Sequence, residues 1–145
     1  MIKRKLGLLL DEKPQYTTIG KIVGEVKFSV TNIRNDNKYS YFKLNIDNPN
    51  STAFDVAGIM LRNVEKDGFF KTKEKNKNRV FPEDVIYDKG KKVEGWSDND
   101  ILFAIKQFGT DEGYLIIKIN ELNGDRNINI EIPVKKVNNA PMFGY

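Results

Sequence analysis

The sequence contains neither cysteine nor histidine. Without cysteine there can be no disulfide, zinc–thiolate site, iron–sulfur cluster or thiol nucleophile. Without histidine there is no Ser-His-Asp or Cys-His arrangement, no histidine general base, and hardly any of the common zinc and non-haem iron sites. Most small hydrolase chemistries are thereby excluded. We therefore expect a protein that is not an enzyme and that uses no cofactor or metal.

The chain also lacks a long apolar run and a strong charge of one sign. No stretch approaches the roughly 20 apolar residues of a membrane span, and 24 basic against 20 acidic residues give a formal charge of only +4. The apolar patch Leu6–Leu10 is too short for the core of a signal peptide and is followed at once by Asp11 and Glu12. We predict that this patch is a first β-strand, in a protein that is not exported, contacts no membrane, and is cytoplasmic or assembled in a virion.

What the chain does have is apolar residues at every second position, most clearly in residues 113–134. Two such runs flank the pair Asn123-Gly124, which tolerates the positive φ of a hairpin turn. A period of two residues places alternate side chains on opposite faces of a strand. The stretch therefore predicts an antiparallel hairpin with one buried face, whose members are Leu115, Ile117, Ile119, Ile128, Ile130, Ile132 and Val134.

Similar patterns recur along the rest of the chain, in residues 26–30, 42–46 and 54–64. Residues 97–108 fit either a strand or a short capped helix, and we favour the strand because its surroundings are β throughout. Seven to nine short strands with turn residues between them are typical of a sandwich or barrel. We predict an all-β fold in which residues 97–108 leave room for one short helix: a single antiparallel β-sandwich domain over residues 1–145, with an OB-like barrel as the alternative.

The segment YFKLNIDNPNSTAFDVAGIML, residues 41–61, resembles the strand-turn-strand segments of immunoglobulin-like sandwiches, in which an apolar strand ends at an Asn-Pro turn. The resemblance covers about 20 residues and implies an immunoglobulin-like fold. The chain has no Cys…Trp…Cys framework of true immunoglobulin domains. The resemblance implies no functional residues.

A basic residue occupies every second position between residues 71 and 79. In an extended segment these side chains would point to one side at intervals of roughly 6.6 Å. They could contact an acidic partner or a nucleic-acid backbone. The favoured interpretation of the same pattern is a solvated loop, or an edge strand that its lysines keep from aggregating. The residues are Lys71, Lys73, Lys75, Lys77 and Arg79.

Two features predict a protein interface. The single tryptophan, Trp96, lies between a glycine and a polar turn and is interpreted as a core or interface anchor. The last residues include Met142, Phe143 and Tyr145, which would be costly to leave in water. We expect this tail to dock either on its own domain or on a neighbouring subunit.

The acidic pairs in the sequence carry no clear chemistry. Asp98 and Asp100 lack the remaining ligands of a calcium loop and are interpreted as a turn or helix cap, and Asp84 and Asp88 as surface residues. The sequence thus predicts a structural or protein-binding subunit of a larger homo- or hetero-oligomeric assembly, such as a capsid accessory or tail-region protein of a phage or virus. The alternative is a nucleic-acid-binding module that uses the basic residues 71–79.

Overall fold

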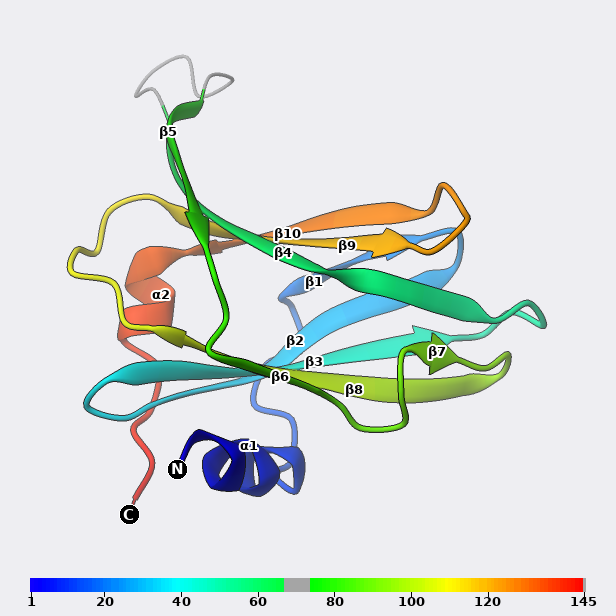
Figure 1. The fold of residues 1–145 in the computed structure, drawn as a ribbon, viewed down its shortest axis with the longest axis horizontal. Coiled ribbons are helices and arrows are strands. Elements are labelled where there is room, and N and C mark those ends of the chain that lie inside the picture. Colours follow the sequence, from blue (N-terminus) through cyan, green and yellow to red (C-terminus); the bar gives the residue numbers. More distant parts are fainter. Residues whose placement is uncertain (67–73, 145) are drawn as a thin grey trace.

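A computed structural model describes residues 1–66 and 74–144, and for residues 66 and 74–78 it describes the backbone alone. Ten strands in this part of the chain form two antiparallel sheets (Figure 1). The first sheet has the order β1-β2-β3-β8-β6, with the bounds Gly20–Val23, Val26–Asn35, Tyr39–Asn48, Ser97–Lys106 and Asp84–Tyr87. The second has the order β10-β9-β4-β5, with the bounds Asn127–Pro133, Tyr114–Glu121, Phe54–Lys66 and Glu74–Val80, and β7 (Lys92–Val93) also pairs with β4. The predicted all-β antiparallel sandwich is confirmed, with two sheets in place of an OB-like barrel.

The core lies between the sheets and is built from the alternating residues that the sequence marks. The inward residues of the β9–β10 hairpin are at most 3% exposed. They share one buried cluster with Val26 and Phe28 of β2 and with Phe42 and Leu44 of β3. Because burial of apolar area is the main favourable term in folding, this shared face fixes which side of each strand points inward.

The predicted hairpin is confirmed in type and differs in its details. Strands β9 and β10 pair in register from Tyr114 and Pro133 to Asn120 and Asn127. Of the predicted turn pair, it is Asn123 that takes the positive φ, at 57°. Position 124 leaves no room for a side chain, since a Cβ there would lie 2.3 Å from a carboxylate oxygen of Glu121. The second strand ends at Pro133, and Val134 begins helix α2 (Val134–Asn138).

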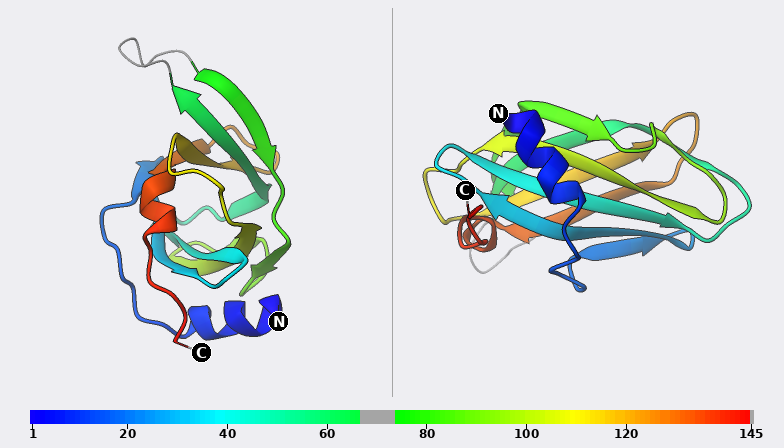
Figure 2. Two further views of the ribbon diagram at one scale, coloured as in Figure 1. Left: turned by 90° about the vertical axis from the view of Figure 1, so that its left-hand side faces the viewer. Right: turned by 90° about the horizontal axis from the view of Figure 1, so that it is seen from below.

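The prediction of a strand at Leu6–Leu10 is wrong, because Ile2–Leu10 forms helix α1. Ile2, Leu6, Leu9 and Leu10 have the spacing of one helix face. That face packs on the outer side of the first sheet, against Tyr41 of β3 and against β8, and Figure 2 shows α1 lying across these strands. The helical spacing of the apolar residues was missed because the leucines at positions 6 and 8–10, taken alone, fit either a helix or a strand.

The ambiguity at residues 97–108 is resolved in favour of the strand, β8. Five consecutive residues of β8, Ile101 to Ile105, are at most 1% exposed. The odd-numbered ones face the core between the sheets, and Leu102 and Ala104 face helix α1. A strand that is buried on both faces loses its alternation, which explains why the pattern resembled a helix.

In residues 1–66 and 74–144, neither helix has the length and apolar character that crossing a bilayer requires.

Candidate functional site

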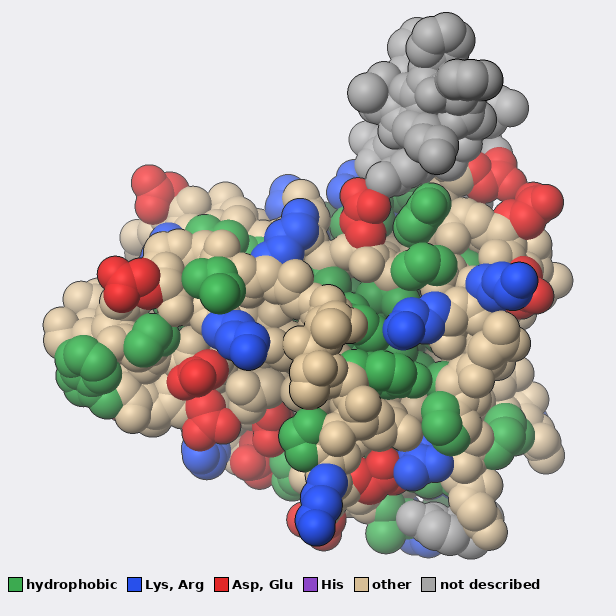
Figure 3. Space-filling model, turned by 180° about the vertical axis from the view of Figure 1, so that it is seen from behind, with side chains coloured by type: hydrophobic (Ala, Val, Ile, Leu, Met, Phe, Trp, Pro, Cys, Tyr) green, Lys and Arg blue, Asp and Glu red, His purple; other side chains and the backbone are tan. Residues whose placement is uncertain are grey.

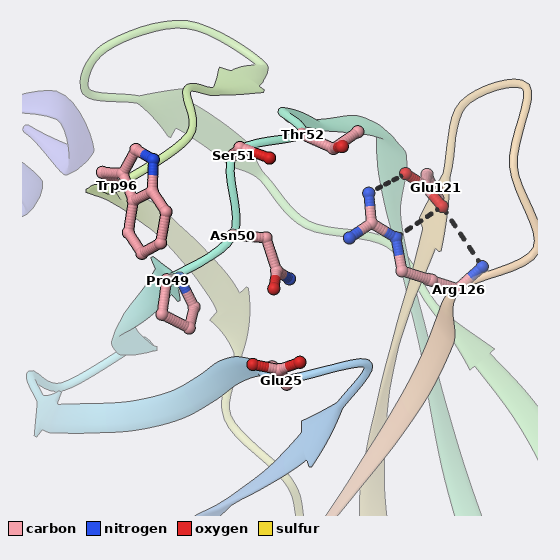
Figure 4. Close-up of a pocket in the computed structure, with 8 residues that line it drawn as sticks. All are labelled: Glu25, Pro49, Asn50, Ser51, Thr52, Trp96, Glu121 and Arg126. Atoms are coloured by element: carbon pink, nitrogen blue, oxygen red, sulfur yellow. Dashed lines mark hydrogen bonds and ion pairs between the residues drawn. The ribbon is translucent and has the colours of Figure 1, made fainter.

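Four connections meet at one end of the sandwich, on the right of Figure 1, and we call residues 24–27, 47–53, 94–98 and 121–126 the loop end. An open pocket of about 580 Å³ lies among them (Figure 4). Figure 4 shows Trp96 and Pro49 on one side of this pocket and Arg126 with Glu121 on the other, with Asn50 between them. The pocket is lined by Glu25, Pro49, Asn50, Ser51, Thr52, Trp96, Glu121 and Arg126.

Trp96 is 75% exposed, although tryptophan is usually largely buried. Its backbone has φ of 59°, which is a costly conformation for a bulky residue. The Trp96 N–H donates to the carbonyl oxygen of Asn50 at 3.0 Å. The preceding Gly95 lies so close to Ser51 that a Cβ would stand 2.5 Å from the Ser51 carbonyl oxygen. The surrounding loops therefore hold the strained backbone in place and present the indole to solvent.

The loop next to Trp96, residues 49–53, is held by two asparagines. The buried Asn48 donates from Nδ2 to the carbonyl oxygens of Thr52 at 2.9 Å and Val93 at 3.2 Å, and its Oδ1 accepts from the Asn50 N–H. Asn50 in turn donates from Nδ2 to the Gly24 carbonyl oxygen at 2.9 Å. Because buried carbonyl groups need partners, these bonds link three of the four connections to one another.

The fourth connection is held by an ion pair. Arg126 donates from Nε and Nη2 to the two carboxylate oxygens of Glu121, and from Nη2 to the Ala53 carbonyl oxygen at 3.1 Å. Its guanidinium lies 5.0 Å from the ring centre of Phe54. The hydrogen bonds from Arg126 hold the pKa of Glu121 below its ordinary value, although burial opposes this shift. A bidentate ion pair of this kind fixes the relative orientation of the two side chains as well as pairing their charges.

The loop end is acidic, in contrast to the chain as a whole. Its 22 residues carry six acidic side chains and two basic ones, against a formal charge of +4 for the whole chain. The acidic residues are Glu25, Asp47, Glu94, Asp98, Glu121 and Asp125, and the basic ones are Lys27 and Arg126. Glu25 is exposed in the pocket wall and, like Trp96, has a positive φ, at 68°.

The predicted interface residues of the tail lie at the opposite end of the sandwich, which we call the terminal end: helix α2, residues 35–41, Lys5 and residues 141–144. The Phe143 N–H donates to the Asn35 carbonyl oxygen at 2.9 Å, and the Phe143 ring packs edge-on against Tyr41 with ring centres 5.2 Å apart. Met142 is 52% exposed, and Tyr145 lies outside the described residues. The tail thus docks on its own domain, far from Trp96.

Two polar side chains hold the terminal end together. Asn35 is buried; its Nδ2 donates to the carbonyl oxygens of Val137, Asn138 and Ala140, and its Oδ1 accepts from Ser40. The carboxylate of Asp36 accepts from Lys5 Nζ at 2.8 Å and from the Tyr41 hydroxyl at 2.5 Å.

The environment of Asp36 shifts the pKa of two groups in opposite directions. Burial by itself raises the pKa of Asp36, but the hydrogen bonds from Lys5, Tyr41 and two backbone N–H groups outweigh it and leave that pKa well below its ordinary value. Burial, together with the hydrogen bond to Asp36, raises the pKa of the Tyr41 hydroxyl. The ionised carboxylate and the neutral phenol are therefore the forms that this end stabilises.

The predicted basic stripe falls partly outside the described residues, which include neither Lys71 nor Lys73. Lys75 and Lys77 lie in strand β5, so the backbone of that half is extended. The register shifts between Glu65 and Lys66, which leaves Lys75 without a paired residue on β4. Arg79 is exposed, with its guanidinium 5.1 Å from the ring centre of Phe81, which is itself 67% exposed.

Of the two acidic pairs, Asp98 and Asp100 lie in a different kind of element from the turn or helix cap that we predicted. Asp98 and Asp100 belong to strand β8 and are not in a turn or helix cap; both accept from Asn45 Nδ2 at 3.0 Å. Asp84 begins β6, and Asp88 follows that strand at its exposed end. Among the residues that the structure describes, no three acidic side chains are grouped so that they could hold a metal ion.

Sequence reasoning singled out Trp96 and missed its partners. Asn50 and Arg126 occupy stretches that read only as turns, Asn48-Pro49-Asn50-Ser51 and the segment after Asn123-Gly124. Turn residues mark where strands end. Which strand ends meet depends on the order of strands in the two sheets, and no short stretch of sequence carries that information.

Comparison with known proteins identifies the family of the chain. Residues 8–142 match the model of the family described as "Domain of unknown function (DUF4138)". The match covers nearly the whole chain, and the protein belongs to this family. No curated protein matches the chain.

Proposed function

We propose that this member of the DUF4138 family is a non-enzymatic, protein-binding subunit of a larger assembly and that the loop end is its docking surface. The observation that carries the proposal is Trp96, which is strained, held by neighbouring loops and 75% exposed. Strain of this kind persists only where the surroundings enforce it, and it gathers at functional sites. Tryptophan and arginine are also enriched among the residues that dominate binding energy at protein interfaces.

The surroundings of Trp96 support a preorganised interface. Leu122 of the β9–β10 turn belongs to the same end and is 53% exposed, while its N–H donates to the Asp55 carbonyl oxygen at 2.8 Å. The hydrogen bonds of Asn48, Asn50 and Arg126 fix the backbone around both apolar groups. A surface whose loops are already ordered loses little conformational entropy on binding.

An immunoglobulin-like assignment is part of the proposal, and the strand order supports it. One sheet contains the order β2-β3-β8-β6 and the other the order β10-β9-β4. Lettered A to G in chain order, these seven strands form the sheets A-B-E-D and G-F-C. That is the strand order of immunoglobulin domains. The connections B–C and F–G then both lie in the loop end. These are two of the three connections that carry antigen binding in variable domains.

The loop end suits any assembly of several subunits, and a phage or virus particle is the one that we propose. Nucleic-acid binding through residues 71–79 is the second candidate function. The exposed Arg79–Phe81 pair supports it, since a guanidinium next to an aromatic ring can contact both phosphate and base. We expect Lys75→Glu with Lys77→Glu to abolish binding of a single-stranded oligonucleotide; unchanged binding in a filter assay would eliminate this candidate.

The docking surface can be tested by photo-cross-linking in the cells or particles from which the protein comes. A benzophenone amino acid at Leu122 should give discrete protein adducts on illumination, and Trp96→Asn in the same chain should remove them. The same amino acid at Glu112, exposed at the other end of the sandwich, is the matched control. If Leu122 gives no adducts and light scattering shows a strict monomer at high concentration, the proposal that the loop end is a docking surface is wrong.

A further inference from the structure

We infer that the loop end recognises a cationic surface of its protein partner, with one lysine or arginine side chain seated between the indole of Trp96 and the carboxylate of Glu25. This inference rests on the proposed function and names the chemistry of the partner. It is carried by three features of the described residues: the local charge, the placement of Trp96 and Glu25 in one pocket, and the neutralisation of the only arginine there.

The local charge is opposite in sign to that of the whole chain. Six acidic residues against two basic ones give the loop end a formal charge of −4 on a protein of formal charge +4. One further cation reaches this end, since Lys89 Nζ donates to the Asp98 carbonyl oxygen at 3.2 Å. Figure 3, which views the molecule from behind, shows acidic side chains beside the hydrophobic ones toward this end. Opposite potentials on two surfaces steer their encounter and exclude partners of the wrong sign.

The two basic residues of the loop end leave that negative charge available to a partner. Arg126 gives its Nε and Nη2 to Glu121, and Lys27 stands opposite Asp47 in the register of β2 and β3. Glu25 and Glu94 are both exposed, and neither forms an ion pair with any residue that the structure describes. Both carboxylates are therefore free to receive a cation.

The pocket presents the two kinds of group that bind a cation. The electron-rich face of an indole attracts ammonium and guanidinium groups, and a carboxylate accepts their hydrogen bonds. Trp96 and Glu25 line the same pocket from different connections, and both are held there with positive φ. The positive φ of Glu25 belongs to the two-residue hairpin turn Gly24-Glu25 between the paired residues Val23 and Val26. An indole and a carboxylate that line one pocket from separate loops point to a receptor for one cationic side chain.

The same features disfavour an anionic partner at this end. A phosphate or acidic peptide would meet Glu25, Glu94 and Asp98, and the guanidinium of Arg126 is already neutralised by Glu121. Any nucleic-acid binding by the described part of the basic stripe, residues 74–79, would involve a different part of the molecule. The loop end and the basic stripe are thus predicted to select partners of opposite charge.

The experiment uses the full chain and the fact that Trp96 is its only tryptophan, so that indole fluorescence reports on the pocket directly. Acetylated, amidated hexa-arginine is titrated at low salt, with hexa-glutamate as the probe of opposite charge. We expect a saturable fluorescence change with hexa-arginine alone. Its dissociation constant should rise at least five-fold in the double variant Glu25→Gln, Glu94→Gln and at least ten-fold between 50 and 200 mM salt.

The matched control is the double variant Glu83→Gln, Glu112→Gln, which removes the same charge from exposed residues outside the loop end. It should change the dissociation constant less than two-fold. Equal weakening by both double variants, no saturable change, or an equal response to hexa-glutamate would overturn the inference. Adducts from Leu122 without charge-dependent peptide binding would overturn the cationic partner alone and leave the docking function standing.

Discussion

The two ends of this sandwich treat their aromatic and charged residues in opposite ways. At the terminal end, Phe143 packs on Tyr41, and the carboxylate of Asp36 is used by Lys5 and Tyr41. At the loop end, Trp96 is 75% exposed, and Glu25 forms no ion pair with a described residue. One end satisfies these groups within the chain. The other leaves an indole and a carboxylate exposed, and we propose that these two groups serve an outside partner.

This difference separates stability from function along one molecule. Groups that are satisfied internally contribute to the free energy of unfolding, whereas strained and exposed groups contribute little or reduce it. Substitutions at the terminal end should therefore destabilise the fold. Substitutions of the exposed loop-end residues Trp96 and Glu25 should affect the proposed binding and leave the fold intact. The following predictions test this contrast, beginning with the largest effect.

Asn35→Ala should reduce the free energy of unfolding by about 3 kcal/mol, since it removes the donor to three carbonyl groups and the acceptor of Ser40 in a buried site. Urea unfolding followed by circular dichroism measures the change. Asn37→Ala is the control, because Asn37 is exposed in the adjacent turn. Equal losses in the two variants would show that Asn35 does not anchor the tail.

Asp36→Asn should cost about 2 kcal/mol at neutral pH, through loss of the charged hydrogen bonds from Lys5 and Tyr41. Because the pKa of Asp36 is lowered in the folded state, its contribution is present above the unfolded pKa of about 4 and is lost as the pH falls below it. Urea unfolding at pH 7 and pH 3 should show the difference between wild type and variant shrinking. Asp125→Asn, at an exposed position of the loop end, is the control and should change the free energy of unfolding by much less at pH 7.

Phe143→Ala should destabilise by about 1 to 2 kcal/mol, less than a fully buried phenylalanine, since the ring is half-buried against Tyr41. In the variant, the backbone amide at position 143 should exchange its hydrogen faster than in the wild type, because its hydrogen bond to the Asn35 carbonyl oxygen opens more often. Met142→Ala, next in the chain and 52% exposed, should change stability by less than half as much. If the two variants behave alike, the tail is not held by its aromatic ring.

Trp96→Asn should have the smallest effect on stability, between no change and a gain of about 1 kcal/mol, because asparagine tolerates positive φ and little buried area is lost. Thermal unfolding measures this effect, and the cross-linking described above measures the loss of binding. A loss of more than about 1 kcal/mol would mean that Trp96 is a structural residue, and the contrast between the two ends would fail.

The extent to which the fold could be predicted depends on how many faces of each element are buried. Strands with one buried face, such as β10, keep a strict alternation and were predicted correctly. Strand β8 and helix α1 cover each other, and their apolar runs lost the period that tells strand from helix. Trp96 was recognised as a candidate because it is the only tryptophan, whereas Glu25 and Arg126 carried no signal until the strands were placed.

The sequence by itself determined the all-β class, the β9–β10 hairpin and the exclusion of histidine and cysteine chemistry, because these depend on composition and on a period of two residues. Only the tertiary structure decided that the tail docks on its own domain and that Trp96, Glu25 and Arg126 share a pocket. The reason is physical: these residues are separated by 30 to 101 positions in the chain, and it is the pairing order of the two sheets that brings their loops to one end.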